Sequence, residues 1–155
     1  MESVAHFREL FQYDRWGNQS ALASLNSVAG SIEKPLKVFS HVIGAQRVWR
    51  ARFVNSSPPD VKPWPALTLE ECQAALDEVY ASWVELLGGL TEERLGQDLV
   101  YRTTQGVEFK TPIRDVLIHL LMHSTYHRGQ VAAAVRESGG KPALTDYVVY
   151  VRQRG

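Results

Sequence analysis

The sequence predicts an all-α protein: a four-helix bundle with a small hairpin or irregular crossover before the last helix. Three observations support this fold class. Apolar residues recur at the three- and four-residue spacing of an α-helix over long stretches. Glycine- and proline-rich segments divide these stretches into four parts. Most of the connections are short, as they are in helical bundles.

The first two helices are predicted from this spacing and from proline positions. The first spans residues 2 to about 27. The second begins near Pro35, which suits a first helical turn because it lacks an N–H group, and runs to about Phe53. The proline-rich segment 55–65 then forms a loop.

The third helix and the hairpin have clearer boundary signals. Thr68 and Glu71 have the spacing of a capping box, which starts the third helix, and Gly88-Gly89 ends it. From residue 97 to 109 apolar residues alternate with polar ones around a turn at Thr104-Gln105-Gly106. This pattern predicts a two-stranded hairpin.

The last helix is predicted to be the longest. Thr111 is expected to cap it and Pro112 to occupy its first position. It runs to about Glu137 and ends at Ser138-Gly139-Gly140. The tail from residue 144 to 151 is apolar enough to pack on the bundle.

Composition is typical of one globular domain over residues 1–155. Of the 155 residues, 45% are apolar and 22% charged, which argues against disorder. Seventeen basic and 17 acidic residues balance to a formal net charge of zero, so we expect no nucleic-acid partner. No apolar run resembles a signal peptide or is long enough to cross a bilayer, so the prediction is a cytoplasmic protein that does not bind membranes.

Histidines carry the chemical information in this chain. His119, His123 and His127 recur at four-residue spacing on the last helix. At 100° per residue, His123 and His127 lie within about 20° of the centre of the apolar stripe through Val116, whereas His119 lies about 60° away. Two buried imidazoles on one stripe favour a metal site, because each ring without a partner would carry a desolvation cost. His119 is expected at the rim.

A third ligand has to come from another helix. His41 is the candidate, since it lies among apolar residues of the second helix, whereas His6 is expected in solvent. A zinc protease would need glutamate directly after the first histidine of the pair, where this chain has Ser124. Di-iron bundles need Glu-x-x-His pairs, and the sequence contains none.

Four segments resemble the DinB-like family of metal-binding four-helix bundles. The run His123-Ser-Thr-Tyr-His127-Arg-Gly-Gln130 is the most specific. Residues 11–18, 39–49 and 146–150 resemble the first helix of the family, the helix with its first histidine and its closing segment, in the right order over nearly the whole chain. Asp14 and Gln46 differ from the family pattern, so neither is given a catalytic role.

The resemblance implies one divalent metal ion per chain, zinc or nickel, held by His41, His123 and His127 with open positions. It also implies a homodimer and a small-molecule substrate. Some relatives are transferases or isomerases that use a low-molecular-weight thiol as cosubstrate. Two alternatives stay open: a hydrolase that uses metal-bound water, and a non-catalytic sensor or interaction module.

Four other residues carry expectations of their own. Tyr126 and Arg128 lie off the histidine stripe and are expected to face solvent or a dimer partner. Gln130 could hydrogen-bond a metal-bound water or cap a backbone group. Cys72 lies in the first turn of the third helix, where the helix dipole could lower its pKa, although a passive thiol is favoured. No catalytic residue is assigned.

Overall fold

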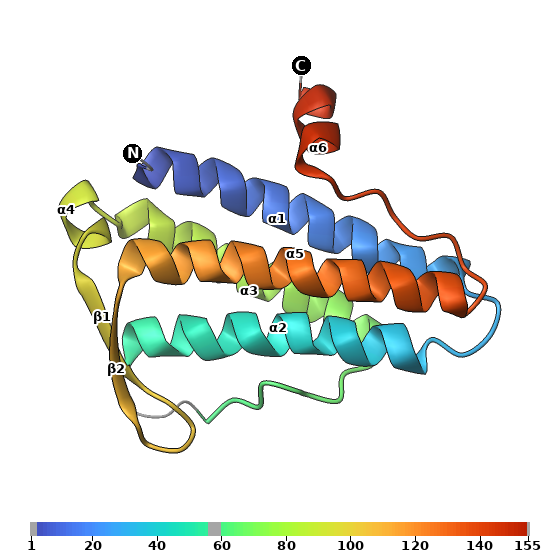
Figure 1. Ribbon diagram of the computed structural model, residues 1–155, viewed down its shortest axis with the longest axis horizontal. Coiled ribbons are helices and arrows are strands. Elements are labelled where there is room, and N and C mark those ends of the chain that lie inside the picture. Colours follow the sequence, from blue (N-terminus) through green and yellow to red (C-terminus); the bar gives the residue numbers. More distant parts are fainter. Residues whose placement is uncertain (1–2, 56–59, 155) are drawn as a thin grey trace.

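The computed structural model describes residues 3–55 and 60–154, and within them four long helices run side by side (Figure 1). They are α1 (Val4–Ser24), α2 (Glu33–Val54), α3 (Leu69–Gly89) and α5 (Ile113–Glu137). Both α1 and α2 pack against α3 and α5, so the apolar stripes of all four helices meet in one core. The predicted all-α bundle is confirmed.

The first connection and the start of α3 agree with their sequence signals. A short 3₁₀ turn, η1 (Leu25–Ser27), follows α1, and α2 starts at Glu33, so Pro35 lies in its first turn. The capping box is present: the Thr68 hydroxyl accepts from the Glu71 N–H at 3.1 Å, and the Glu71 carboxylate accepts from the Thr68 N–H at 2.7 Å. Of the predicted loop 55–65, residues 56–59 lie outside the described residues.

The hairpin is confirmed, but the predicted start of the last helix is wrong by one residue. Strands β1 (Asp98–Arg102) and β2 (Glu108–Pro112) pair antiparallel, and Gly106 in the turn has φ +79°. Thr111 pairs with Leu99 in the ladder, and its hydroxyl lies 3.2 Å from the Tyr101 hydroxyl, so it does not cap α5. Strand pairing therefore continues to Pro112, and α5 begins at Ile113.

Two short helices were not predicted. The first, α4 (Glu92–Leu95), precedes the hairpin and is capped by the Thr91 side chain. The second, α6 (Tyr147–Arg154), forms the tail and stands across the long axis of the bundle beside α1 (Figure 1). Only Tyr150 of α6 is buried, whereas Val148 is 51% exposed. The tail therefore packs on the bundle as predicted, but through one face only.

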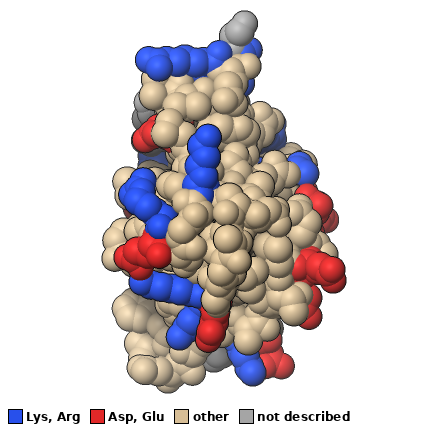
Figure 2. Space-filling view, turned by 90° about the vertical axis from the view of Figure 1, so that its right-hand side faces the viewer, with Lys and Arg blue, Asp and Glu red and all other residues tan. Residues whose placement is uncertain are grey.

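The surface carries charges of both signs. On the face shown in Figure 2, basic and acidic side chains are scattered, and neither forms a continuous patch. None of the helices in the described ranges combines the length and the apolar character needed to span a bilayer.

Candidate metal centre

Helices α2 and α5 bring His41, His123 and His127 together. One ring nitrogen of each histidine lies within 4.8 Å of those of the other two. The closest pair is His41 Nε2 and His123 Nε2, which are 3.2 Å apart. The ring centroids of His123 and His127 are 4.4 Å apart, because residues four positions apart share one face of α5. The predicted helical phase thus agrees with the structure, and metal ligation by these residues stays a prediction.

Backbone and side-chain oxygens hold two of the rings by their Nδ1 atoms. The Nδ1–H of His41 donates to the Pro63 carbonyl at 2.6 Å, and that of His127 donates to Gln130 Oε1 at 2.7 Å. In a neutral imidazole this leaves Nε2 with a free lone pair. Gln130 thus has a role that the sequence did not predict, and its hydrogen bond to a metal-bound water stays a prediction. It orients a histidine, as the oxygens behind metal-binding imidazoles commonly do.

Residues 63–65 form one side of the site and lie close against the backbone of α2 at Gly44. A Cβ atom added to Gly44 of α2 would lie 2.5 Å from the Pro63 carbonyl oxygen, so only glycine allows the segment to lie this close. The approach places the Trp64 indole parallel to the His41 ring, with centroids 3.8 Å apart and planes 7° apart. The sequence pattern alone assigned no role to Trp64. Its place between two prolines is the signal that could have found it.

Burial and mutual proximity lower the pKa of two of the three histidines, His41 and His123. His41 and His127 are 9% and 8% exposed, and His123 is half-buried. Burial lowers the pKa of His41, and the nearby His127 lowers it further. Burial, together with the neighbouring His127, His41 and His119, lowers the pKa of His123 to about 4. Neutral imidazole is the form that coordinates metal, so His41 and His123 need not lose protons to bind an ion near pH 7.

The donor set fits a divalent ion. Nitrogens bound to zinc at 2.0–2.1 Å with tetrahedral angles lie about 3.3 Å apart, close to the 3.2 Å between His41 and His123. His119 lies outside this cluster, at the expected rim. Its exposed ring packs against Trp49, with centroids 5.4 Å apart, and partial burial lowers its pKa, as does the charge of Arg52.

The expectation that Arg128 faces solvent or a partner is wrong. Arg128 is 2% exposed, and its Nη1 donates to Asp14 Oδ1 of α1 at 2.6 Å. A Cβ atom on Gly17 would lie 3.0 Å from the guanidinium, so a glycine on α1 makes room for it. The off-stripe face of α5 points at α1 because α5 is buried on two sides. Tyr126, at 65% exposed, does lie on the surface.

Around this ion pair a buried network joins the four long helices. Tyr80 of α3 donates to Asp14 Oδ2 at 2.5 Å, and Gln46 of α2 donates to the same oxygen at 3.1 Å. Asn18 Nδ2 donates to Ser124 Oγ of α5 at 2.8 Å. The signal in the sequence is a pair of polar residues four apart on each of two helices, Asp14 with Asn18 and Ser124 with Arg128.

Cys72 and His6 lie away from the histidine cluster. Cys72 is fully buried, and burial raises the pKa of its thiol, so the idea that the helix dipole activates it finds no support. His6 is exposed, as expected.

Comparison with known proteins gives a consistent result. A model of the DinB family matches residues 6–154. The chain is 25% identical over 158 residues to the protein DinB of Bacillus subtilis (strain 168), with 92% of each chain covered. The crystal structure of a DinB-like protein from Bacillus cereus ATCC 10987 has the same fold, with a TM-score of 0.72 and 19% identity over 92% of this chain and 97% of that one.

Proposed function

Because this chain belongs to the DinB family and brings three histidines together, we propose that it binds one divalent metal ion, zinc or nickel, through His41, His123 and His127. The observation that carries the proposal is the convergence of three ring nitrogens, two of them 3.2 Å apart, with the Nδ1 atoms of His41 and His127 held by oxygens.

We infer that this centre is catalytic. A structural zinc site is closed by four protein ligands, whereas the group found in the described residues has three histidines and no carboxylate or thiolate. His123 is half-buried, which leaves the site accessible. When bound, the ion would lower the pKa of a thiol or water that reaches it.

The reaction we propose is the transfer or isomerisation of a small electrophile with a low-molecular-weight thiol as cosubstrate. The chain offers no aspartate or glutamate beside the histidines that could act as general base, within the part that the structure describes. A thiol that reacts as its own thiolate needs no such base, whereas water activation benefits from one. A metal-dependent hydrolase is therefore the second candidate, and a non-catalytic module the third.

Metal content tests the centre directly. Purified protein should contain close to one divalent ion per chain, and His41→Ala, His123→Ala and His127→Ala should each lose it. His119→Ala, a histidine on the same helix but outside the cluster, is the matched control and should keep its metal. Full metal occupancy in His123→Ala would contradict the assignment.

Thiol binding tests the chemistry. In cobalt-substituted protein, a thiol that binds as thiolate should change the visible spectrum, and His41→Ala should abolish the change. A spectrum that no thiol perturbs would leave the hydrolase as the leading account.

We also propose a homodimer. Met122 and Tyr126 of α5 are 68% and 65% exposed, and they lie beside exposed Tyr147 of α6 along an apolar groove between α1 and α5. Exposed apolar surface of this kind commonly marks a protein interface. Sedimentation of the wild type should give a dimer, and Met122→Lys should shift it toward monomer.

A further inference from the structure

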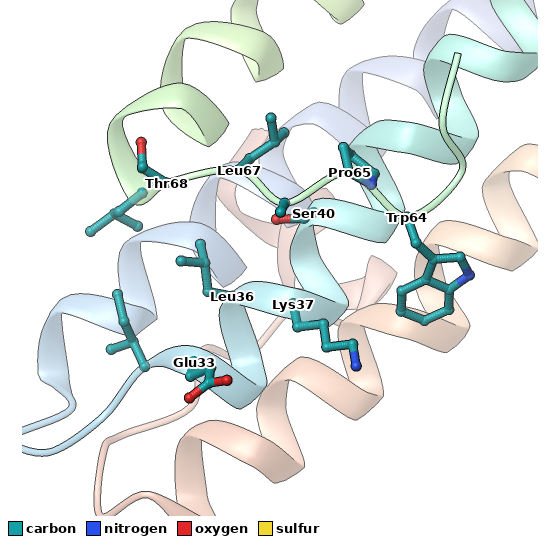
Figure 3. A pocket seen from close by; sticks show the side chains of 11 residues that line it. Glu33, Leu36, Lys37, Ser40, Trp64, Pro65, Leu67 and Thr68 are labelled. Atoms are coloured by element: carbon teal, nitrogen blue, oxygen red, sulfur yellow. The ribbon is translucent and has the colours of Figure 1, made fainter. Parts of the chain in front are cut away.

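A second feature lies beside the histidines: an apolar pocket between the start of α2 and the segment that leads into α3 (Figure 3). Its volume is about 600 Å³, within the range of small-molecule sites. Its walls are mostly apolar, formed by Ile32, Leu36, Trp64, Pro65, Leu67 and Leu69. From Ile32 to Ser40 it follows α2 for about 12 Å, at 1.5 Å per residue.

Trp64 connects this pocket to the histidine cluster. Its indole lines the pocket and stacks on the His41 ring at 3.8 Å, and its centroid lies 6.3 Å from that of His127. The indole is 51% exposed. Trp64 is thus the residue that the pocket and the histidine cluster have in common.

Two charged residues of α2 line the pocket, Lys37 and Glu33. Lys37 lies one helical turn before His41 and lines the pocket. In Figure 3 it extends to the same side as Trp64. It makes no ion pair with any residue in the described ranges. Glu33 lies a turn further, about 12 Å along the helix from His41. Of these two lining residues, the positive one therefore lies nearer to His41 along the helix and the negative one lies at the far end.

Three neutral imidazoles would leave both charges of a divalent ion uncompensated, and Lys37 adds another positive charge nearby. We propose that the site takes a monoanion with an apolar body: the anionic end, a thiolate or carboxylate, lies at the histidines, and the apolar body fills the pocket past Trp64. This inference rests on the proposed metal centre and deepens it, because it names the class of ligand.

The proposal predicts that affinity depends on chain length. Burying one methylene contributes ~0.8 kcal/mol, which corresponds to an increase in affinity of up to about fourfold. Calorimetric titration of zinc-loaded protein with unbranched alkanethiols and alkanoates should show a rise of about two- to fourfold per methylene until the pocket is full. Comparison of the two series shows which head group binds, and an alcohol of equal length should bind at least tenfold more weakly.

Matched variants test whether the dependence of affinity on chain length arises in this pocket. Leu36→Gln, in the pocket wall, should flatten the dependence on chain length without changing zinc content. Leu86→Gln is the control, since Leu86 of α3 is also half-buried on a helix but does not line the pocket. Lys37→Met should lower the affinity for short and long anions by the same factor. Lys34→Met should leave both affinities unchanged, because Lys34 pairs with Glu137.

The outcomes separate this inference from the proposed function. Zinc-loaded protein whose affinity does not vary with chain length would overturn the inference and leave the metal centre intact. Equal losses in Leu36→Gln and Leu86→Gln would also overturn it. Wild-type protein that takes up no zinc would instead contradict the metal centre, and the inference with it.

Discussion

Two faces of α5 meet different surroundings within the same two turns. Toward α2, His123 and His127 form a cluster with His41, and His123 is half-buried. Toward α1 and α3, Ser124 and Arg128 enter a sealed network in which the Arg128 and Asp14 side chains are each 1% exposed. Ser124 directly follows His123 in the sequence, and Arg128 directly follows His127, so consecutive residues lie on different faces of the helix.

The difference separates two tasks of one helix: one face presents the histidines, and the other fixes how the helix packs. A buried ion pair adds little net stability, because desolvation offsets much of its attraction, but it penalises any arrangement that separates the charges. Arg128 contacts α1 through Asp14, and Gln46 of α2 donates to the same carboxylate. The network therefore determines how α5 lies against α2, and with it the spacing of His41 from His123.

The largest effect should come from breaking the sealed face. Arg128→Met leaves the Asp14 carboxylate buried without its charged partner, and we expect a loss of about 3–5 kcal/mol in the free energy of unfolding, measured with urea. Arg15→Met is the control: Arg15 and Asp77 form an exposed pair at 3.5 Å, so the change should stay below about 1 kcal/mol. Equal effects would mean that burial of the pair has no special consequence.

Tyr80→Phe should have the next largest effect. It removes the hydroxyl that donates to Asp14 Oδ2 and that is held protonated, since burial and the Asp14 charge raise the pKa of Tyr80 well above its usual value. We expect a loss of about 1–3 kcal/mol, measured by thermal unfolding. Tyr126→Phe, on the exposed side of α5, should change nothing, and a similar loss there would contradict the prediction.

Gln130→Ala tests the histidine face of α5. It removes the oxygen that accepts from His127 Nδ1, so we expect metal affinity to fall about 10–100-fold. The free energy of unfolding of the metal-free protein should change by no more than about 0.5 kcal/mol, because Gln130 is exposed. Competition with a chelator measures the affinity. Gln130→Glu, which keeps the acceptor, should retain it.

The smallest effect is a pH dependence of the metal-free protein. The folded state lowers the pKa of His123 from 6.5 to about 4, so the unfolded state binds more protons between these values. Stability should therefore be complete above pH 6.5 and decrease as pH falls toward 4. The decrease should be about 1 kcal/mol, since solvent screens a half-buried ring. In His123→Ala the loss of stability between pH 6.5 and 4 should be smaller than in the wild type. A loss as large as that of the wild type would assign the pH dependence to other groups.

The sequence by itself determined the parts of the protein that depend on neighbouring residues. Helical periodicity and the Thr68–Glu71 capping box located α3, and alternation located the hairpin, because these signals act within a few residues. The spacing of His123 and His127 placed both rings on one face of α5 for the same reason. His41 could be named only as a candidate, since nothing local joins α2 to α5.

Only the tertiary structure decided what lies on either side of those histidines. Periodicity measures one apolar stripe per helix, so it assigned Arg128 to the surface, whereas packing against α1 buries the second face of α5. Trp64 reaches His41 because Gly44 admits residues 63–65 onto α2, a contact between segments about 20 positions apart. Thr111 does not cap α5 as predicted, because it pairs with Leu99 across the hairpin. In each case a partner distant in sequence outweighed the local preference.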